Sequence, residues 1–144
     1  MALRQSDIDC TVDVCLTFTP VEEGDEAGLT AFISRDGHLR FAITRDEAGP
    51  CAIIARSDAQ QPIVRQPIAG NEFSLRLVAD RERYTFCIAS AGGLYRCIGS
   101  VPVLTRAHAG KCFTGTLLGV YAQCTGPTSA RAVLHSFRIS PGVP

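Results

Sequence analysis

The side chains most able to do chemistry in this sequence are its seven cysteines. They stand at positions 10, 15, 51, 87, 97, 112 and 124, so successive cysteines are 5, 36, 36, 10, 15 and 12 positions apart. No two of them form a Cys-x-x-Cys pair, the spacing typical of zinc sites and of redox dithiols. An odd number also prevents complete pairing within one chain. The pattern favours buried thiols that act as small hydrophobic side chains, and we expect no metal and no cofactor.

Carboxylates, hydroxyls and histidines form no recognisable catalytic motif either. The acidic residues gather in two places, 7–13 and 22–26, which we interpret as charge on a solvated strand face and in a solvated loop. The sequence contains no nucleophile elbow, zinc-protease helix motif or phosphate-binding loop. His135 shares its expected strand face with apolar residues, and a lone histidine in such a place is typical of a hydrogen-bonded core residue. We therefore identify no catalytic residue.

Alternating apolar and polar residues indicate that strands carry these side chains. In residues 7–19, every second residue from Ile8 to Phe18 is apolar, which indicates a long strand with one buried face. In 116–123 both faces are largely apolar, so we expect cover on both sides. Further strands are predicted at 27–33, 38–44, 51–56, 62–68, 72–79, 83–90, 94–99 and 131–139. Short strands separated by turns predict an all-β, two-sheet antiparallel sandwich, with an open barrel as the alternative.

Two turns predict hairpins. The Asp-Gly pair at 36–37, between two strand-like runs, is a strong short-range hairpin signal. Residues 90–94 fit a three-residue hairpin loop with Gly93 in the left-handed conformation. That register pairs residues whose numbers sum to 184 and sets Cys87 opposite Cys97. Two facing cysteines could form a disulfide, but a reducing cytosol and the demanding geometry of the bond favour two free thiols.

Length and composition bound the domain organisation and the partners. The chain has 144 residues, which suits one domain, and we expect a single β-sandwich over residues 1–144. Net charge is zero and the arginines are scattered, which argues against binding to nucleic acid or to an anionic membrane surface. The N-terminus lacks the apolar core of a secretory signal, and no run is long enough to cross a membrane. We therefore expect a cytoplasmic protein.

The stretch 109–122, AGKCFTGTLLGVYA, carries the most informative motif. It resembles the GGFTG…IGLYA segment of the C-terminal β-sandwich of glycoside hydrolase family 43 β-xylosidases and arabinofuranosidases. Weaker matches follow the order of the family: RQ at 4–5, DEAGL at 25–29, YTF at 84–86, GGLY at 92–95 and FR at 137–138. Together these motifs extend over nearly the whole chain. The resemblance implies a concanavalin A-like jelly roll.

In that family the loop phenylalanine reaches across to a five-bladed catalytic propeller, which supplies the two catalytic carboxylates. By resemblance, Phe113 and its neighbours Cys112 and Thr114 would contact the propeller or the rim of its active site. The chain contains nothing that resembles the propeller itself. It also departs from the family, because Tyr95 replaces the hairpin tryptophan and His-Ser at 135–136 replaces an Asp-Trp pair. These changes weaken a general glycan-binding platform and a structural calcium site.

Three functions remain open at this point. The first is a non-catalytic accessory module of a family 43-like glycoside hydrolase, which packs on a catalytic β-propeller and lends a loop aromatic to its active-site rim. The second is a free-standing lectin-like domain that binds xylo- or arabino-oligosaccharides through Tyr95, Tyr84 or Tyr121. The third is a sandwich groove recruited as an enzyme pocket for small-molecule chemistry, although a fold alone specifies no reaction.

Overall fold

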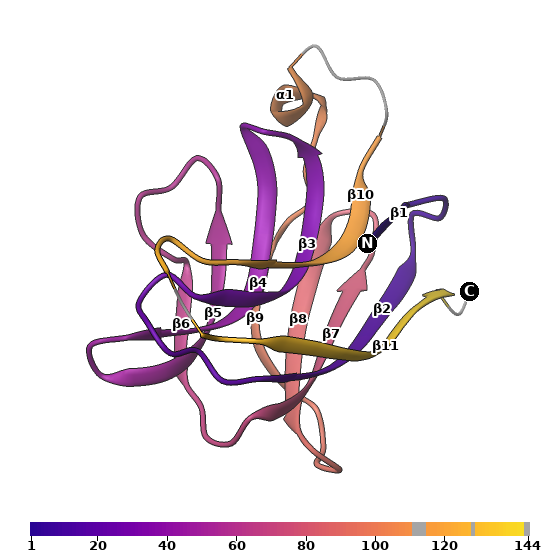
Figure 1. Ribbon diagram of the computed structural model, residues 1–144. Coiled ribbons are helices and arrows are strands. Elements are labelled where there is room, and N and C mark those ends of the chain that lie inside the picture. Colours follow the sequence, from indigo (N-terminus) through magenta and orange to yellow (C-terminus); the bar gives the residue numbers. More distant parts are fainter. Residues whose placement is uncertain (111–114, 128, 143–144) are drawn as a thin grey trace.

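The computed structural model describes residues 1–110, 115–127 and 129–142. Its strands form two antiparallel sheets, which face each other as a sandwich (Figure 1). Sheet A has the strand order β1 (Ala2–Arg4), β10 (Leu117–Gln123), β3 (Glu26–Ser34), β4 (Gly37–Asp46), β5 (Gly49–Arg56) and β6 (Val64–Pro67). Sheet B has the order β11 (Ala132–Pro141), β2 (Cys10–Phe18), β7 (Glu72–Ala79), β8 (Arg83–Ser90) and β9 (Arg96–Pro102). The predicted all-β sandwich is confirmed.

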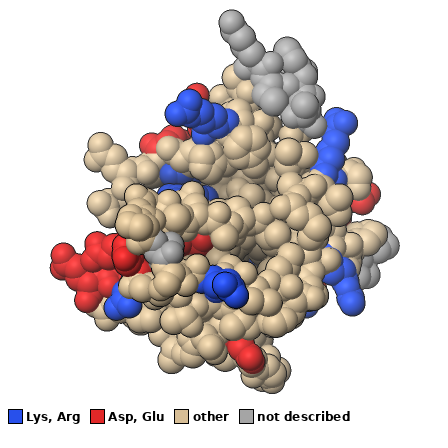
Figure 2. Space-filling model, viewed as in Figure 1, with Lys and Arg blue, Asp and Glu red and all other residues tan. Residues whose placement is uncertain are grey.

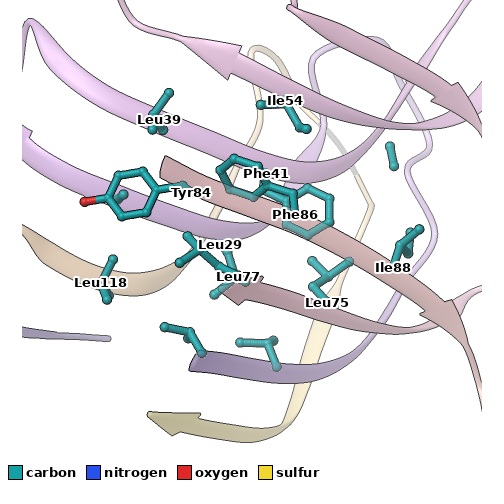
Figure 3. Packing of buried hydrophobic residues seen from close by; sticks show 14 of the residues in the cluster. Leu29, Leu39, Phe41, Ile54, Leu75, Leu77, Tyr84, Phe86, Ile88 and Leu118 are labelled. Atoms are coloured by element: carbon teal, nitrogen blue, oxygen red, sulfur yellow. The ribbon is translucent and has the colours of Figure 1, made fainter. Parts of the chain in front are cut away.

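One large hydrophobic core lies between the sheets. Each strand contributes every second side chain to it, as the alternating burial of β2 and β7 shows. Phe41 from sheet A and Phe86 from sheet B meet edge to face, with ring centroids 5.2 Å apart (Figure 3). Such an aromatic contact stabilises the fold beyond the burial of the two rings alone, so these phenylalanines strengthen the packing between the sheets at the centre. The other fully buried large side chains are Tyr84, Leu29, Leu39, Ile43, Ile54, Leu75, Leu77, Leu118, Val12 and Val14.

Every predicted strand is present, with its ends shifted by a few residues. Sequence analysis missed the three-residue strand β1 and the four-residue helix α1 (Arg106–Ala109), because both are too short to show a period. The predicted strand 7–19 also begins three residues before β2, which starts at Cys10. Ile8 is 57% exposed and lies before β2, although its place in the alternation assigned it to the buried face.

The hairpin predictions are confirmed in part. Strands β3 and β4 pair across Gly37, and Cys87 lies opposite Cys97. Beyond the two cysteines, the predicted pairing of residues whose numbers sum to 184 is wrong. A bulge after Phe86 sets Phe86 opposite Gly99 and not opposite Ile98. The left-handed glycine is also Gly92, with φ 68°, and not its neighbour. A backbone hydrogen bond of 2.9 Å from residue 93 to residue 90 closes a four-residue turn, whose third position is the one that takes positive φ.

The expectation that His135 is a core residue is wrong. The pairing of β11 with β2 shifts between Leu134 and Ser136, so His135 is the extra residue of a β-bulge. Residues on either side of a bulge no longer alternate, and Phe137 therefore faces the core while His135 lies exposed. Its Nε2 lies 2.7 Å from the hydroxyl of Thr17 on the outer surface of sheet B.

Candidate functional site

The family-like motif, residues 109–122, begins at the last residue of α1 and includes most of β10. The helix α1 lies at one end of the sandwich (Figure 1). Phe113, Cys112 and Thr114 lie outside the described residues. The glycines that flank the segment, Gly110 and Gly115, have φ angles of 55° and 76°. Residues that carry a side chain rarely adopt such angles, so glycine suits both of these positions within the motif.

His108 anchors the first flank of this loop to sheet A. Its backbone oxygen accepts a hydrogen bond of 2.7 Å from the hydroxyl of Ser34. A side chain on Gly37 could not fit, because a Cβ atom there would lie 2.1 Å from the same oxygen. The backbone N–H of Thr105 donates to Nδ1 of the His108 ring at 2.9 Å. These contacts hold the short helix against the β3–β4 turn.

The charged pair of Arg56 and Asp58 lies next to these contacts. Together with Ser34 and His108 it forms what we call the loop stem. Arg56 binds Asp58 through two hydrogen bonds of 2.9 and 2.8 Å, and these bonds lower the pKa of the Asp58 carboxyl. Nη2 of Arg56 also lies 3.1 Å from Nε2 of His108. A guanidinium only donates, and a neutral imidazole has a single acceptor nitrogen. The Thr105 N–H takes that acceptor at Nδ1, so Nε2 carries the proton and the approach of Arg56 is a close contact and not a second accepted hydrogen bond. An open depression of about 480 Å³ adjoins the stem and is lined by Ser34, Arg35, Asp36, Asp58 and 107–110.

The outer face of sheet A carries a second polar cluster. Arg40 donates to both oxygens of Glu26 at 3.0 and 2.9 Å, and Tyr121 and Gln123 donate to one of them at 2.8 and 3.0 Å. Glu26 is only 7% exposed. Asp25 is buried too and accepts hydrogen bonds from two backbone N–H groups of the preceding loop. The interpretation of 22–26 as solvated charge is therefore wrong for these two acids, which fix the entry into β3.

The three tyrosines considered as carbohydrate contacts occupy three different environments. Tyr84 is 2% exposed and lies between the sheets, so its assignment as a surface contact is wrong (Figure 3). Tyr121 lies on the outer face of sheet A with its hydroxyl bound to a carboxylate. Tyr95 lies on the outer face of sheet B, where the Arg76 guanidinium is 4.1 Å from its ring centroid and its hydroxyl donates to Asp13 at 3.3 Å. The tyrosines therefore form no shared stacking platform.

These environments predict the alkaline titration of the protein. Burial raises the pKa of Tyr84, and burial followed by a neighbouring carboxylate raises the pKa of Tyr95 and, most strongly, of Tyr121. We expect the phenolate absorbance of the folded protein to rise only above pH 10, and that of the urea-unfolded chain to rise at about pH 10. Because the folded state retains these protons longer, stability should fall as pH increases through this range.

The measurement is a spectrophotometric titration of folded and unfolded protein. Tyr121→Phe should remove the phenol that titrates last and leave the two earlier ones in place. A folded protein in which all three tyrosines titrate with the unfolded chain would contradict the burial of these hydroxyls.

We next consider metal-ligating and charged side chains in the part of the chain that the structure describes. Among residues 1–110, 115–127 and 129–142, no three His, Cys, Asp or Glu side chains are close enough to share a metal ion. Within the same residues, no helix has the length and apolar character needed to cross a membrane. On the face seen in Figure 2, basic side chains are spread over the surface, and the largest group of acidic side chains lies at the left, with others apart from it.

Residues 1–140 match the family model described as the β-xylosidase C-terminal concanavalin A-like domain. The chain belongs to this family. Two solved structures that share the fold of this C-terminal domain are the Bacteroides ovatus xyloglucan PUL GH43B and the xylan β-1,4-xylosidase from Bacillus halodurans C-125. Their TM-scores are both 0.83, their identities 24% and 22%, and they cover 97% and 96% of this chain. The chain spans only 29% and 28% of their own lengths.

A functionally unknown protein from Saccharomyces cerevisiae also has this fold, with a TM-score of 0.79 and 14% identity. It covers 100% of this chain, which spans 74% of that protein. At such identities the likeness shows the fold alone. No curated protein matches the chain.

Sequence analysis missed His108, Arg56, Arg40 and the role of Glu26. Only the capping pattern Thr105-x-x-His108 is a local signal, and it identifies a helix start and not a function. Arg56 has a near partner in Asp58, but the remaining contacts join residues that are far apart in the chain. Ser34 and His108, for example, are 74 positions apart.

Proposed function

We propose that this chain is a non-catalytic accessory module of a family 43-like glycoside hydrolase, which packs on a catalytic β-propeller and contributes Phe113 to the rim of the active site. The match of residues 1–140 to a β-xylosidase C-terminal domain carries this proposal. Two relatives that share the fold are family 43 proteins more than three times as long as the matched region, so each contains much additional chain.

The loop stem supports the same function. The first flank of the motif is fixed by His108, and the second by a hydrogen bond of 2.9 Å from the N–H of Gln5 to the carbonyl of Thr116. Both anchors belong to sheet A or to the segment that follows β1. A loop held at both ends loses less conformational entropy when it meets a partner, so this arrangement favours presentation of a loop residue to another protein.

The two alternatives lack a supporting observation in the described residues. A lectin-like domain needs an exposed aromatic surface, and Tyr84, Tyr95 and Tyr121 are buried or bound to neighbouring side chains on separate faces. An enzyme pocket needs free acid or base groups. In the depression beside α1, the lining residue Asp58 is bound by Arg56, which also lies 3.1 Å from His108.

The test is to mix the purified module with a family 43 propeller that lacks its own C-terminal module, preferably one encoded beside it. Binding should stabilise the module by about 2.7 kcal/mol when the propeller is present at a hundred times the Kd. We expect a higher melting temperature and a change in activity on aryl xylosides. Calorimetry with xylo- and arabino-oligosaccharides at millimolar concentration serves as the control and should give no heat for the module alone. If neither melting temperature nor activity responds to the propeller, docking is excluded.

A further inference from the structure

A pair of cysteines lies on the outer face of sheet B, in a continuous row of paired residues. The backbone pairings set Asp13 opposite Arg76, Arg76 opposite Cys87, and Cys87 opposite Cys97. Cys87 is half-buried and Cys97 is exposed. All six cysteines of the described part are free thiols. The row therefore contains two thiols side by side, with a cation next to one of them.

The register places these two thiols at a distance that a disulfide can bridge. Directly opposed residues of antiparallel strands have Cα atoms roughly 4.5 to 5.5 Å apart, and disulfides need about 4.4 to 6.8 Å. Burial, and then the charge and hydrogen bond of the Cys97 thiol, raise the pKa of Cys87, which agrees with the facing positions that the register gives the two residues. The bond can thus form without a change of register.

The other described cysteines have no thiol partner in the sheets. Cys10 and Cys51 are buried and lie opposite Ala79, Pro141, Thr44 and Pro67. Cys15 lies opposite Ser74, and their side chains are 3.3 Å apart. Within residues 1–110, 115–127 and 129–142, Cys87 and Cys97 are the pair that the pairing brings together.

We propose that Cys87 and Cys97 form a reversible dithiol site, which a low-molecular-weight disulfide oxidises to a bond across the β8–β9 hairpin. The exposed Cys97 gives its proton to solvent, and its thiolate attacks one sulfur of the oxidant. That sulfur stays bound to Cys97 as a mixed disulfide, and the other sulfur of the oxidant leaves as the first thiolate. Cys87 then loses its proton and attacks the sulfur of Cys97, which displaces the second thiolate. Two protein thiols are oxidised, and one disulfide is reduced to two thiols.

The neighbours of the pair fit this order of steps. Cys97 is the accessible sulfur, so it meets the oxidant first. Arg76 lies opposite Cys87, and its charge lowers the pKa of that thiol against the effect of burial. Asp13 and Tyr95 share the same guanidinium, so Arg76 is held in place beside the sulfur. The site depends on none of the residues proposed to meet the propeller.

The experiment exposes the whole folded protein to oxidised glutathione, unfolds it in urea, blocks the remaining thiols with an alkylating reagent, and measures intact mass and cross-linked peptides. We expect five of the seven thiols to stay reactive, a mass lower by two hydrogens before alkylation, and a peptide that joins Cys87 to Cys97. A thiol reductant should restore both. Because the fold holds the thiols together, closure should be at least about tenfold faster than in the urea-unfolded chain.

Matched variants separate the pair from general thiol reactivity. Cys15→Ser, on the same sheet face, should leave the link intact, whereas Cys87→Ser should trap glutathione on Cys97. Thermal melting checks that each variant is folded, and the wild-type mass stands without them. A persistent glutathione adduct on Cys97 in the wild-type protein, a link only between molecules, or equal closure rates in the folded and unfolded chains would overturn the proposal.

Discussion

Replacing Arg40 with methionine should destabilise the isolated module more than the loss of any exposed charge. The change leaves the Glu26 carboxylate, 7% exposed, with only the neutral donors of Tyr121 and Gln123. Removing one partner of a buried ion pair costs about 3 to 5 kcal/mol. The Arg40 side chain is 28% exposed, so solvent screens part of the interaction, and we expect about 2 to 3 kcal/mol. The urea midpoint of unfolding measures this loss.

Two further variants make the expectation specific. Combining Arg40→Met with Glu26→Gln should restore more than half of the lost stability, because the uncompensated charge is then gone. Arg138 lies exposed on the edge strand β11, and its change to methionine should alter stability by less than about 0.5 kcal/mol. Equal losses for Arg40 and Arg138 would show that Glu26 does not depend on its cation.

This ion pair marks the limit of what the sequence could predict. Local alternation placed the strands and the Asp-Gly hairpin, because side-chain periodicity and turn chemistry act over a few residues. Within an unbroken stretch of a strand, it also gave the face on which the residues lie. Local alternation could not predict that β10 pairs with β3. Tyr121 is 95 positions from Glu26 and reaches it only through this pairing. A buried acid therefore looked like a solvated one.

The wrong register predictions share one physical cause. A single inserted residue reverses the parity of a strand, and nothing in the local sequence marked the bulges at Phe86 and His135. The facing pair Cys87 and Cys97 was nevertheless predicted correctly, because it lies between the bulge and the turn. Predictions from a turn hold up to the first irregularity and fail beyond it.

The loop motif was predicted by resemblance, and its anchoring was not. His108 lies in a helix of four residues, too short for any periodic signal. Its contacts with Ser34 and Arg56 span 74 and 52 positions. The resemblance pointed to the segment that we propose meets the propeller, whereas the contacts that fix its flanks arise from tertiary structure.

Replacing Phe113 with alanine should separate docking from folding. If Phe113 serves a partner, the isolated module should lose less than about 0.5 kcal/mol, the range of surface substitutions. In the complex with the propeller, the loss of a central aromatic contact is worth about 2 kcal/mol, or about thirtyfold in kcat/KM on an aryl xyloside. Denaturant midpoints of the module and steady-state kinetics of the complex measure the two effects.

Leu94 provides the matched control, because it is 94% exposed in the β8–β9 turn, at the opposite end of β9 from α1. Leu94→Ala removes exposed apolar surface as Phe113→Ala does, but it should leave both stability and kcat/KM unchanged. A stability loss of roughly 3 to 5 kcal/mol in the isolated Phe113→Ala module would identify Phe113 as a core residue. An unchanged kcat/KM in the complex would remove it from the active-site rim even if the propeller still binds, since docking through other surfaces would then account for any shift in melting temperature.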